Sequence, residues 1–144
     1  MKAETPRPRA AESARSDDEG GARWRALALL SLAELSGMSL WFSASAVVPA
    51  LSAEWHLSEA GAGWLTLAVQ LGFVAGTLLS ALLNLPDVLS ARRLFTIAAI
   101  IGAAVNAAFG LFASDAATGI TLRFFVGLCL AGVYPPGMKI MATW

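Results

Sequence analysis

Two ionisable side chains lie inside long apolar segments of this sequence. Glu34 interrupts the first such segment and Arg123 lies in the last. If the segments cross a bilayer, each charge costs roughly 2.5–3.5 kcal/mol near the helix centre, so it must face a partner or a cavity. A carboxyl group there can also carry a proton. We therefore expect Glu34 and Arg123 to handle a substrate or a proton, with a buried pair that only fixes helix register as the alternative.

A second group of charges separates the second and third apolar segments. Asp87 is followed after four residues by the pair Arg92 and Arg93. A carboxylate at a helix end beside a basic pair can form a contact that is made and broken. The alternative is a positive loop that only sets the orientation of the chain in a membrane, which arginines near helix ends do in any case.

Other kinds of site lack the residues that they require. Cys129 is the only cysteine and His56 the only histidine, so we expect no disulfide, no metal site and no Ser-His-Asp or Cys-His catalysis. The glycines lie inside apolar segments and form neither a phosphate-binding loop nor a dinucleotide fingerprint. A formal net charge of zero argues against nucleic-acid binding. We expect no enzymatic activity and no cofactor.

Composition indicates an all-α integral membrane protein. The 144 residues are 57% hydrophobic and 14% charged, against about 25% charged residues in soluble domains. Each apolar segment reaches the roughly 20 residues that a helix needs to cross the hydrocarbon core. A single segment in lipid has to satisfy its own backbone hydrogen bonds, which favours helices. We predict four transmembrane helices, at about 26–51, 61–85, 94–113 and 117–141.

The distribution of charge predicts the domain boundary and the topology. Residues 1–22 contain no aromatic and no branched apolar residue, and their charge is mixed. We therefore predict a disordered cytoplasmic tail at residues 1–24 and a membrane domain at 25–144. Arginines precede the first helix and separate the second from the third, while the other two connections carry none. The positive-inside rule then places both termini in the cytoplasm.

Small residues predict how the helices pack. Helices two and three each carry small or polar residues at every fourth position, which is typical of seams where helix backbones approach closely in lipid. Pro135 and Pro136 should break or kink the fourth helix because proline lacks the backbone N–H. The glycines that we assign to packing are Gly72, Gly76, Gly102, Gly110, Gly127 and Gly132.

The fourth helix and the loop between helices two and three resemble the major facilitator superfamily of transporters. The run from Arg123 through Gly127 and Gly132 to Pro135 is similar to the fourth helix of that family, with its arginine, glycines and late proline. The aspartate followed by an arginine pair, Asp87 with Arg92 and Arg93, is similar to the family's cytoplasmic loop motif, although Leu83 and Ser90 stand where glycines are usual.

The resemblance implies the first third of a twelve-helix fold. It implies that Asp87, Arg92 and Arg93 belong to an inner gate, and that Glu34 and Arg123 border a central pathway. The expected function is secondary active transport of a small solute by alternating access, with a proton as a candidate coupling ion. The chain would be an amino-terminal fragment in a plasma membrane, a bacterial inner membrane in our interpretation, partnered by the missing helices or by another copy.

Two alternatives remain open at this point. One is a complete four-helix, proton-coupled multidrug exporter that acts as a dimer. The charged tail, the loop motif and the proline-broken fourth helix argue against it. The other is a four-helix structural or assembly protein without transport. Glu34 and Arg123 argue against that function, since buried charges cost stability and a scaffold gains little from them.

Overall fold

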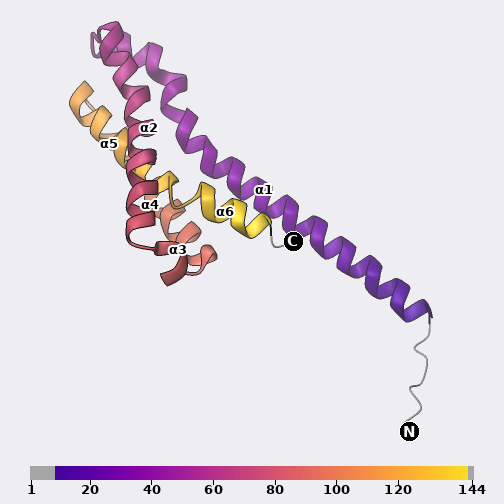
Figure 1. The fold of residues 1–144 in the computed structure, drawn as a ribbon. Helices are drawn as coiled ribbons and strands as arrows, with labels where there is room; N and C mark the ends of the chain where they lie inside the picture. The colour runs from indigo at the N-terminus through magenta and orange to yellow at the C-terminus, as the bar shows by residue number, and fades with distance from the viewer. Residues whose placement is uncertain (1–8, 143–144) are drawn as a thin grey trace.

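The computed structural model describes residues 9–142, and the side chains of residues 20–142 apart from Pro86. Every regular element in this range is a helix, and four stretches are long and apolar enough to cross a membrane. The all-α prediction with four spans is confirmed. The elements are α1 (Arg9–Glu54), α2 (Glu59–Leu82), α3 (Leu85–Val88), α4 (Ala91–Phe112), α5 (Ala116–Leu130) and α6 (Tyr134–Met141), as Figure 1 shows.

The first helix is longer than the sequence predicts. α1 runs without interruption from Arg9 to Glu54, and its candidate membrane span lies within residues 20–54. Residues 9–24 are helical in this structure, whereas residues 1–8 of the predicted tail lie outside the described range. Alanine, arginine and glutamate, which have high helix propensity, supply most of residues 9–15 and explain the extension. The boundary predicted near residue 24 is not marked by a break in α1.

The fourth span consists of two helices. α5 ends at Leu130, residues 131–133 form a turn, and α6 starts at Tyr134. Pro135 and Pro136 occupy the first turn of α6, where a helix does not need their missing N–H groups. The same prolines remove the helical donors to the carbonyls of Ala131 and Gly132. The fourth span is thus broken between Leu130 and Tyr134.

Helices α2, α4, α5 and α6 gather along one side of α1 (Figure 1). The connections at residues 55–58 and 113–115 lie at one end of the bundle, and α3 lies at the other. Ser58 and Asp115 cap α2 and α5 by accepting hydrogen bonds from Gly61 N and Thr118 N. The chain thus alternates between the two ends, as four successive spans require.

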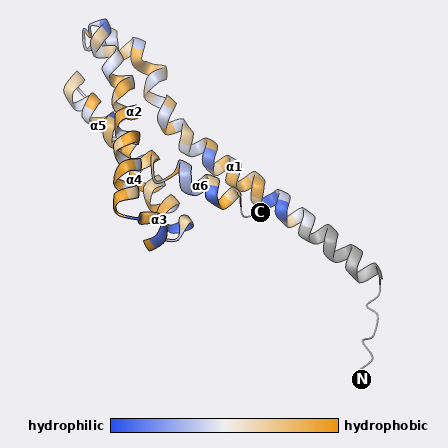
Figure 2. Ribbon diagram, viewed as in Figure 1, coloured by the Kyte–Doolittle hydropathy of each residue, from blue (hydrophilic) through white to orange (hydrophobic). Residues whose placement is uncertain are grey.

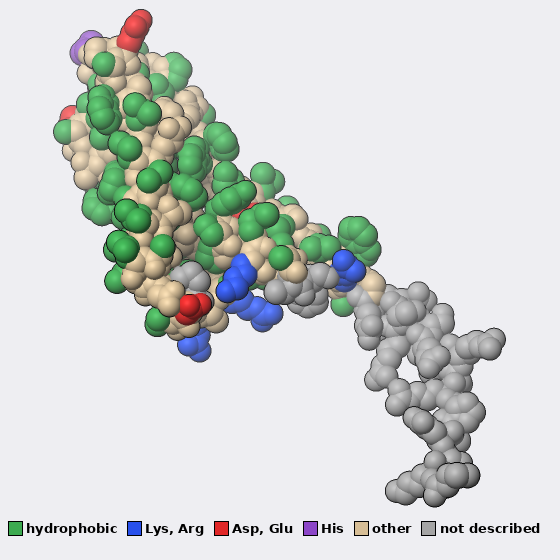
Figure 3. All heavy atoms as spheres, viewed as in Figure 1, with side chains coloured by type: hydrophobic (Ala, Val, Ile, Leu, Met, Phe, Trp, Pro, Cys, Tyr) green, Lys and Arg blue, Asp and Glu red, His purple; other side chains and the backbone are tan. Residues whose placement is uncertain are grey.

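Apolar side chains cover the outside of this bundle. Leu82 and Leu111 are 74% and 76% exposed, and Figure 2 shows hydrophobic ribbon along most of the spans. In Figure 3 lysines and arginines gather near α3 and α6, while the histidine lies at the opposite end. Such a surface suits a hydrocarbon environment bounded by polar headgroups. The interior is formed by two apolar clusters, one around Leu65 and Phe109 and one around Val69 and Val126.

Candidate functional site

Arg123 is the most completely buried charged residue among the described side chains. It lies on α5 with 0% of its surface exposed. Its Nη1 donates a hydrogen bond to the carbonyl of Leu40 at 3.0 Å, and its Nη2 donates to that of Trp41 at 2.7 Å. Both acceptors belong to α1. Because a charged donor strengthens a hydrogen bond, the guanidinium fastens α5 to the backbone of α1.

The surroundings of this contact are apolar. Val69 and Val126 form a buried cluster against which Leu40 and Trp41 also pack. The indole of Trp41 meets the ring of Phe73 edge-on, with centroids 5.4 Å apart. Nε of Arg123 has no hydrogen-bond partner. The guanidinium therefore lies in low-dielectric surroundings where its hydrogen bonds to α1 are strong and costly to lose.

Glu34 is positioned by α1 against the second half of the broken fourth span. Both of its carboxyl oxygens are enclosed by protein, and neither has a hydrogen-bond partner. A Cβ added to Gly137 would overlap Oε1 of Glu34 and would lie 3.2 Å from Cε2 of Phe95. Only glycine fits at residue 137 while the carboxyl group keeps this position. The contact joins α1 to α6.

Glu34 and Arg123 do not pair with each other. Arg123 bonds to α1 at Leu40 and Trp41, six and seven residues beyond Glu34, which corresponds to about 9–10 Å along the helix axis. The two charges instead hold α1 to different halves of the fourth span. Arg123 lies on α5, before the break, and Glu34 contacts α6, after it. The structure therefore does not contain the buried pair of Glu34 and Arg123 that the sequence left open as an alternative.

Glycines bring α2 and α5 into backbone contact. A Cβ at Gly72 would overlap the carbonyl of Phe124, and one at Gly127 would overlap that of Val69. At Gly76 a Cβ would lie 2.7 Å from the carbonyl of Leu128. Small residues permit this approach, which supplies the van der Waals contact that holds helices together in lipid. Gly127 lies one turn beyond Arg123 on α5. The helix that packs on α2 through this glycine is therefore also the one that carries Arg123.

Most of the chain matches the sequence pattern of one protein family. Residues 29–144, which include Glu34, Arg123 and the broken fourth span, match the model of the Major Facilitator Superfamily. The chain belongs to the Major Facilitator Superfamily. Searches of curated proteins and of solved structures found no match. The superfamily consists of transporters that handle small solutes, and with its four candidate spans the chain is a multi-pass membrane protein in a lipid bilayer.

Other predicted packing residues of this superfamily member lie at different contacts. A Cβ at Gly132 would lie 2.6 Å from that of Ala98 on α4, and one at Gly102 would lie 3.2 Å from that of Cys129. At Gly110 an added Cβ would meet nothing within 4 Å. Gly110 is exposed and takes no part in a helix contact within the described range. It has the spacing of a seam residue, but it faces away from the bundle.

The predicted gate residues lie at the end of the bundle that carries α3. Asp87 is exposed within α3, and Arg92 and Arg93 are exposed in the first turn of α4. Asn84, with a φ of 51°, reverses the chain between α2 and α3. No ion pair within 4.0 Å joins Asp87 to either arginine among the described side chains. All three side chains are therefore free to meet groups outside this part of the chain.

The sequence did not identify two partners in the site. Gly137 faces Glu34, and Gly37 of α1 faces Val133, whose Cγ1 would lie 2.8 Å from an added Cβ. Gly37 lies three residues after Glu34, so one face of α1 carries both. The spacing of Glu34 and Gly37 can be read from the sequence, but the residues that they contact are known only from the structure.

Proposed function

We propose that this chain supplies the first four helices of a secondary active transporter that moves a small solute by alternating access. Family membership supports transport in general. The observation that carries the mechanism is the enclosed, unpartnered carboxyl group of Glu34 against Gly137. A carboxylate without a partner is costly in apolar surroundings. Glu34 therefore holds a proton in this arrangement and gains water or substrate when α6 moves away.

The broken fourth span supplies the moving part. Residues 131–133 separate α5 from α6, and the prolines leave two carbonyls without helical donors. Arg123 holds α5 to α1, while Glu34 supplies a contact between α6 and α1. Binding and release of a coupling proton at Glu34 then change the packing of α6 without disturbing α5.

The positions of the arginines bear on topology, and the loop motif bears on partners. Arginines near α1 and α4 support cytoplasmic termini, and a bacterial inner membrane is the membrane that we propose. Asp87, Arg92 and Arg93 act as an inner gate whose counterpart is another part of the transporter. Further helices of the same transporter complete the pathway, as the resemblance to a twelve-helix fold indicates. The transporter family favours this function over an assembly protein.

Solute uptake tests the proposed function. The intact transporter is reconstituted into vesicles with an imposed proton gradient and offered labelled sugars, amino acids, carboxylic acids and the cationic dye ethidium. We expect at least one solute to accumulate above its external concentration and to leave when a protonophore is added. Vesicles without protein are the control. Failure of every solute to accumulate, or accumulation that ignores the protonophore, contradicts proton-coupled transport.

Reconstitution of the 144-residue chain by itself tests whether further helices are needed. We expect the solute that the intact transporter accumulates to remain at its external concentration with this chain alone. Accumulation by the chain alone would support the four-helix dimeric exporter instead.

A further inference from the structure

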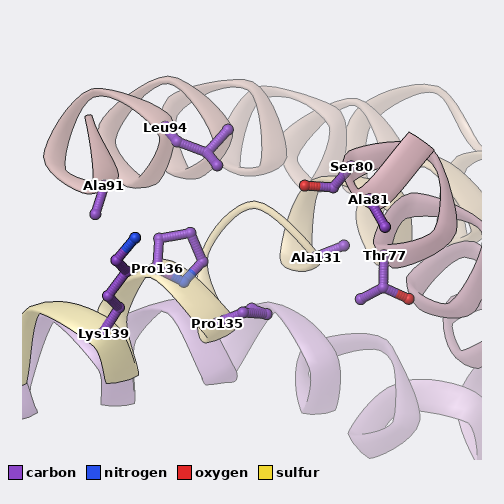
Figure 4. Close-up of a pocket in the computed structure, with 9 residues that line it drawn as sticks. All are labelled: Thr77, Ser80, Ala81, Ala91, Leu94, Ala131, Pro135, Pro136 and Lys139. Atoms are coloured by element: carbon purple, nitrogen blue, oxygen red, sulfur yellow. The ribbon is translucent and has the colours of Figure 1, made fainter. Parts of the chain in front are cut away.

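A cavity of about 340 Å³ lies beside the break in the fourth span. Its walls come from α2, from the first turn of α4 and from the residues around the break, and Figure 4 shows these side chains converging from three directions. Cavities that hold small molecules have volumes of about 300–1,000 Å³. The space is therefore large enough for part of a ligand, and it is distinct from the contact of Glu34 with Gly137.

The walls of this cavity are almost entirely apolar. Leu94, Ala131 and Pro135 are among the apolar residues that line it near the break. The single hydroxyl proton of Thr77 is directed to its own helix, where the carbonyls of Phe73 and Val74 lie 3.0 and 2.9 Å from the oxygen. Hydrocarbon fits such a surface better than a polar solute, since apolar groups gain from leaving water.

Lys139 is the one charged residue that lines the cavity. Its ammonium group points across the cavity mouth towards Ala91 at the start of α4 (Figure 4). Arg92 and Arg93 follow Ala91 directly and are exposed at the same end of the molecule. Asp87 of α3 is the exposed carboxylate at that end, and Glu34 is enclosed on the α1 side of α6. Among the described side chains near the cavity mouth, these three cations outnumber the one exposed carboxylate, which favours an anionic ligand.

We propose that this cavity binds an anionic phospholipid of the surrounding bilayer. The phosphate lies at Lys139 and is attracted by Arg92 and Arg93, and one acyl chain lies against Leu94, Ala131 and Pro135. Basic pockets between transmembrane helices bind anionic headgroups on this principle. The apolar walls match the acyl chain of such a lipid, and the cationic mouth matches its anionic headgroup. The lipid contacts α4 and the break together, so it holds α6 against α4. The binding does not depend on the proposed transport.

Native mass spectrometry of the full chain tests the proposal. The chain is kept in neutral detergent and titrated separately with phosphatidylglycerol and phosphatidylcholine of the same acyl chains. We expect one tightly bound phosphatidylglycerol and at least fivefold weaker binding of phosphatidylcholine. Equal affinity for the two lipids contradicts an anionic site.

Variants locate the bound lipid. Lys139→Gln should weaken phosphatidylglycerol binding about fivefold, the effect of one surface cation on an anionic lipid. Arg25→Gln, which removes an exposed arginine of α1 outside the cavity lining, is the matched control and should change binding less than twofold. Equal effects of the two variants would show general attraction to the basic end and overturn the site.

Filling the cavity provides an independent test. Ala81 is exposed on α2 and lines the cavity, so Ala81→Phe should displace the acyl chain and abolish tight binding. Ala103→Phe, on an exposed part of α4 outside the lining, should leave binding unchanged. Unchanged binding in Ala81→Phe overturns the proposal. Displacement of phosphatidylglycerol by an equimolar amount of palmitate also overturns the proposal. The same holds if no lipid binds and the chain instead forms a dimer that Ala81→Phe dissociates.

Discussion

Glu34 on α1 and Gly137 on α6 are in contact so close that a Cβ at residue 137 would overlap Oε1 of Glu34 unless the carboxyl group moved. The carboxyl group fills the space that a Cβ would occupy, yet it has no hydrogen-bond partner there. Shape alone holds the two helices at this point. The contact therefore joins α1 to α6 through a group that can take up or release a proton.

Gly137→Ala tests this contact through stability. The added methyl group collides with Oε1 of Glu34, and forcing a group into a packed site typically costs about 1–3 kcal/mol. We expect a lower midpoint of thermal unfolding in detergent. Gly110→Ala is the control, because its Cβ meets open space and alanine is favoured over glycine in a helix by about 0.5–1 kcal/mol. Equal midpoints for the two variants would contradict the packing of α1 against α6.

Arg123→Lys and Arg123→Gln separate charge from hydrogen bonding at α5. Lysine keeps the charge but cannot reach both carbonyls with a planar fork, and glutamine loses both properties. Hydrogen bonds from charged groups contribute about 1.5–3 kcal/mol each. We expect the midpoint of thermal unfolding to be highest with arginine at residue 123, lower with lysine and lowest with glutamine. Lys139→Gln, which removes an exposed cation, should leave the midpoint almost unchanged.

The emission of Trp41 gives a local readout for the same variants. Its carbonyl accepts from Nη2 of Arg123 and its indole packs on Phe73. Loss of the guanidinium should shift the fluorescence of this tryptophan, measured as a difference against chains that carry Trp41→Phe. A stability loss without any change in Trp41 emission would place the effect of Arg123 elsewhere.

Labelling of single cysteines tests the proposed topology. In a Cys129→Ser background, Ser58→Cys lies at the α1–α2 connection and Ser90→Cys lies before α4, at opposite ends of the bundle. A membrane-impermeant maleimide added to intact cells should label residue 58 at once and residue 90 only after permeabilisation. The reverse pattern would place both termini outside.

Asp115 makes the start of α5 sensitive to acid. Hydrogen bonds from the backbone and side chain of Thr118 hold the pKa of the Asp115 carboxyl below its ordinary value of 3.8. A group with a lowered folded-state pKa contributes stability above its unfolded-state pKa and loses it as the pH falls through the folded-state pKa. We expect the protection of the Thr118 amide, which is the chemical exchange rate divided by the observed rate at the same pH, to be constant at pH 5–8 and to fall below about pH 4.

Ser58 supplies the matched control for this pH dependence. Its hydroxyl caps α2 by accepting from Gly61 N at 3.2 Å, and a hydroxyl does not titrate in this range. Protection at Gly61 should therefore stay constant where protection at Thr118 falls. Parallel loss at both amides would indicate general unfolding in acid.

Segment-level features of this fold follow from the sequence because single physical constraints set them. Length and apolar content determine that α2 and α4 span a membrane, and two adjacent prolines determine that the fourth span breaks before residue 135. Neither conclusion needs knowledge of a neighbouring helix. The extension of α1 to Arg9 was missed because the mixed charge of residues 9–24 suits a helix and a disordered tail equally.

Contacts between helices could not be predicted in the same way. Gly102 and Gly110 lie on one stripe of α4 at the same spacing, but only Gly102 meets another helix. A stripe identifies a face, while the rotation, tilt and length of the partner helix decide which of its positions are covered. For the same reason the sequence left a pair between Glu34 and Arg123 open, whereas their actual partners are Gly137 and two backbone carbonyls.

Glu34→Gln tests the central claim, that the state of this carboxyl group couples proton movement to solute movement. Glutamine keeps the shape that packs on Gly137 but cannot release a proton. With the solute that the intact transporter accumulates, we expect Glu34→Gln to lose proton-driven accumulation at least tenfold while it retains solute exchange across the vesicle membrane. Its unfolding midpoint should be unchanged. Glu54→Gln, at the exposed end of α1, should behave as the unmodified protein. Full proton-driven accumulation by Glu34→Gln would contradict the account.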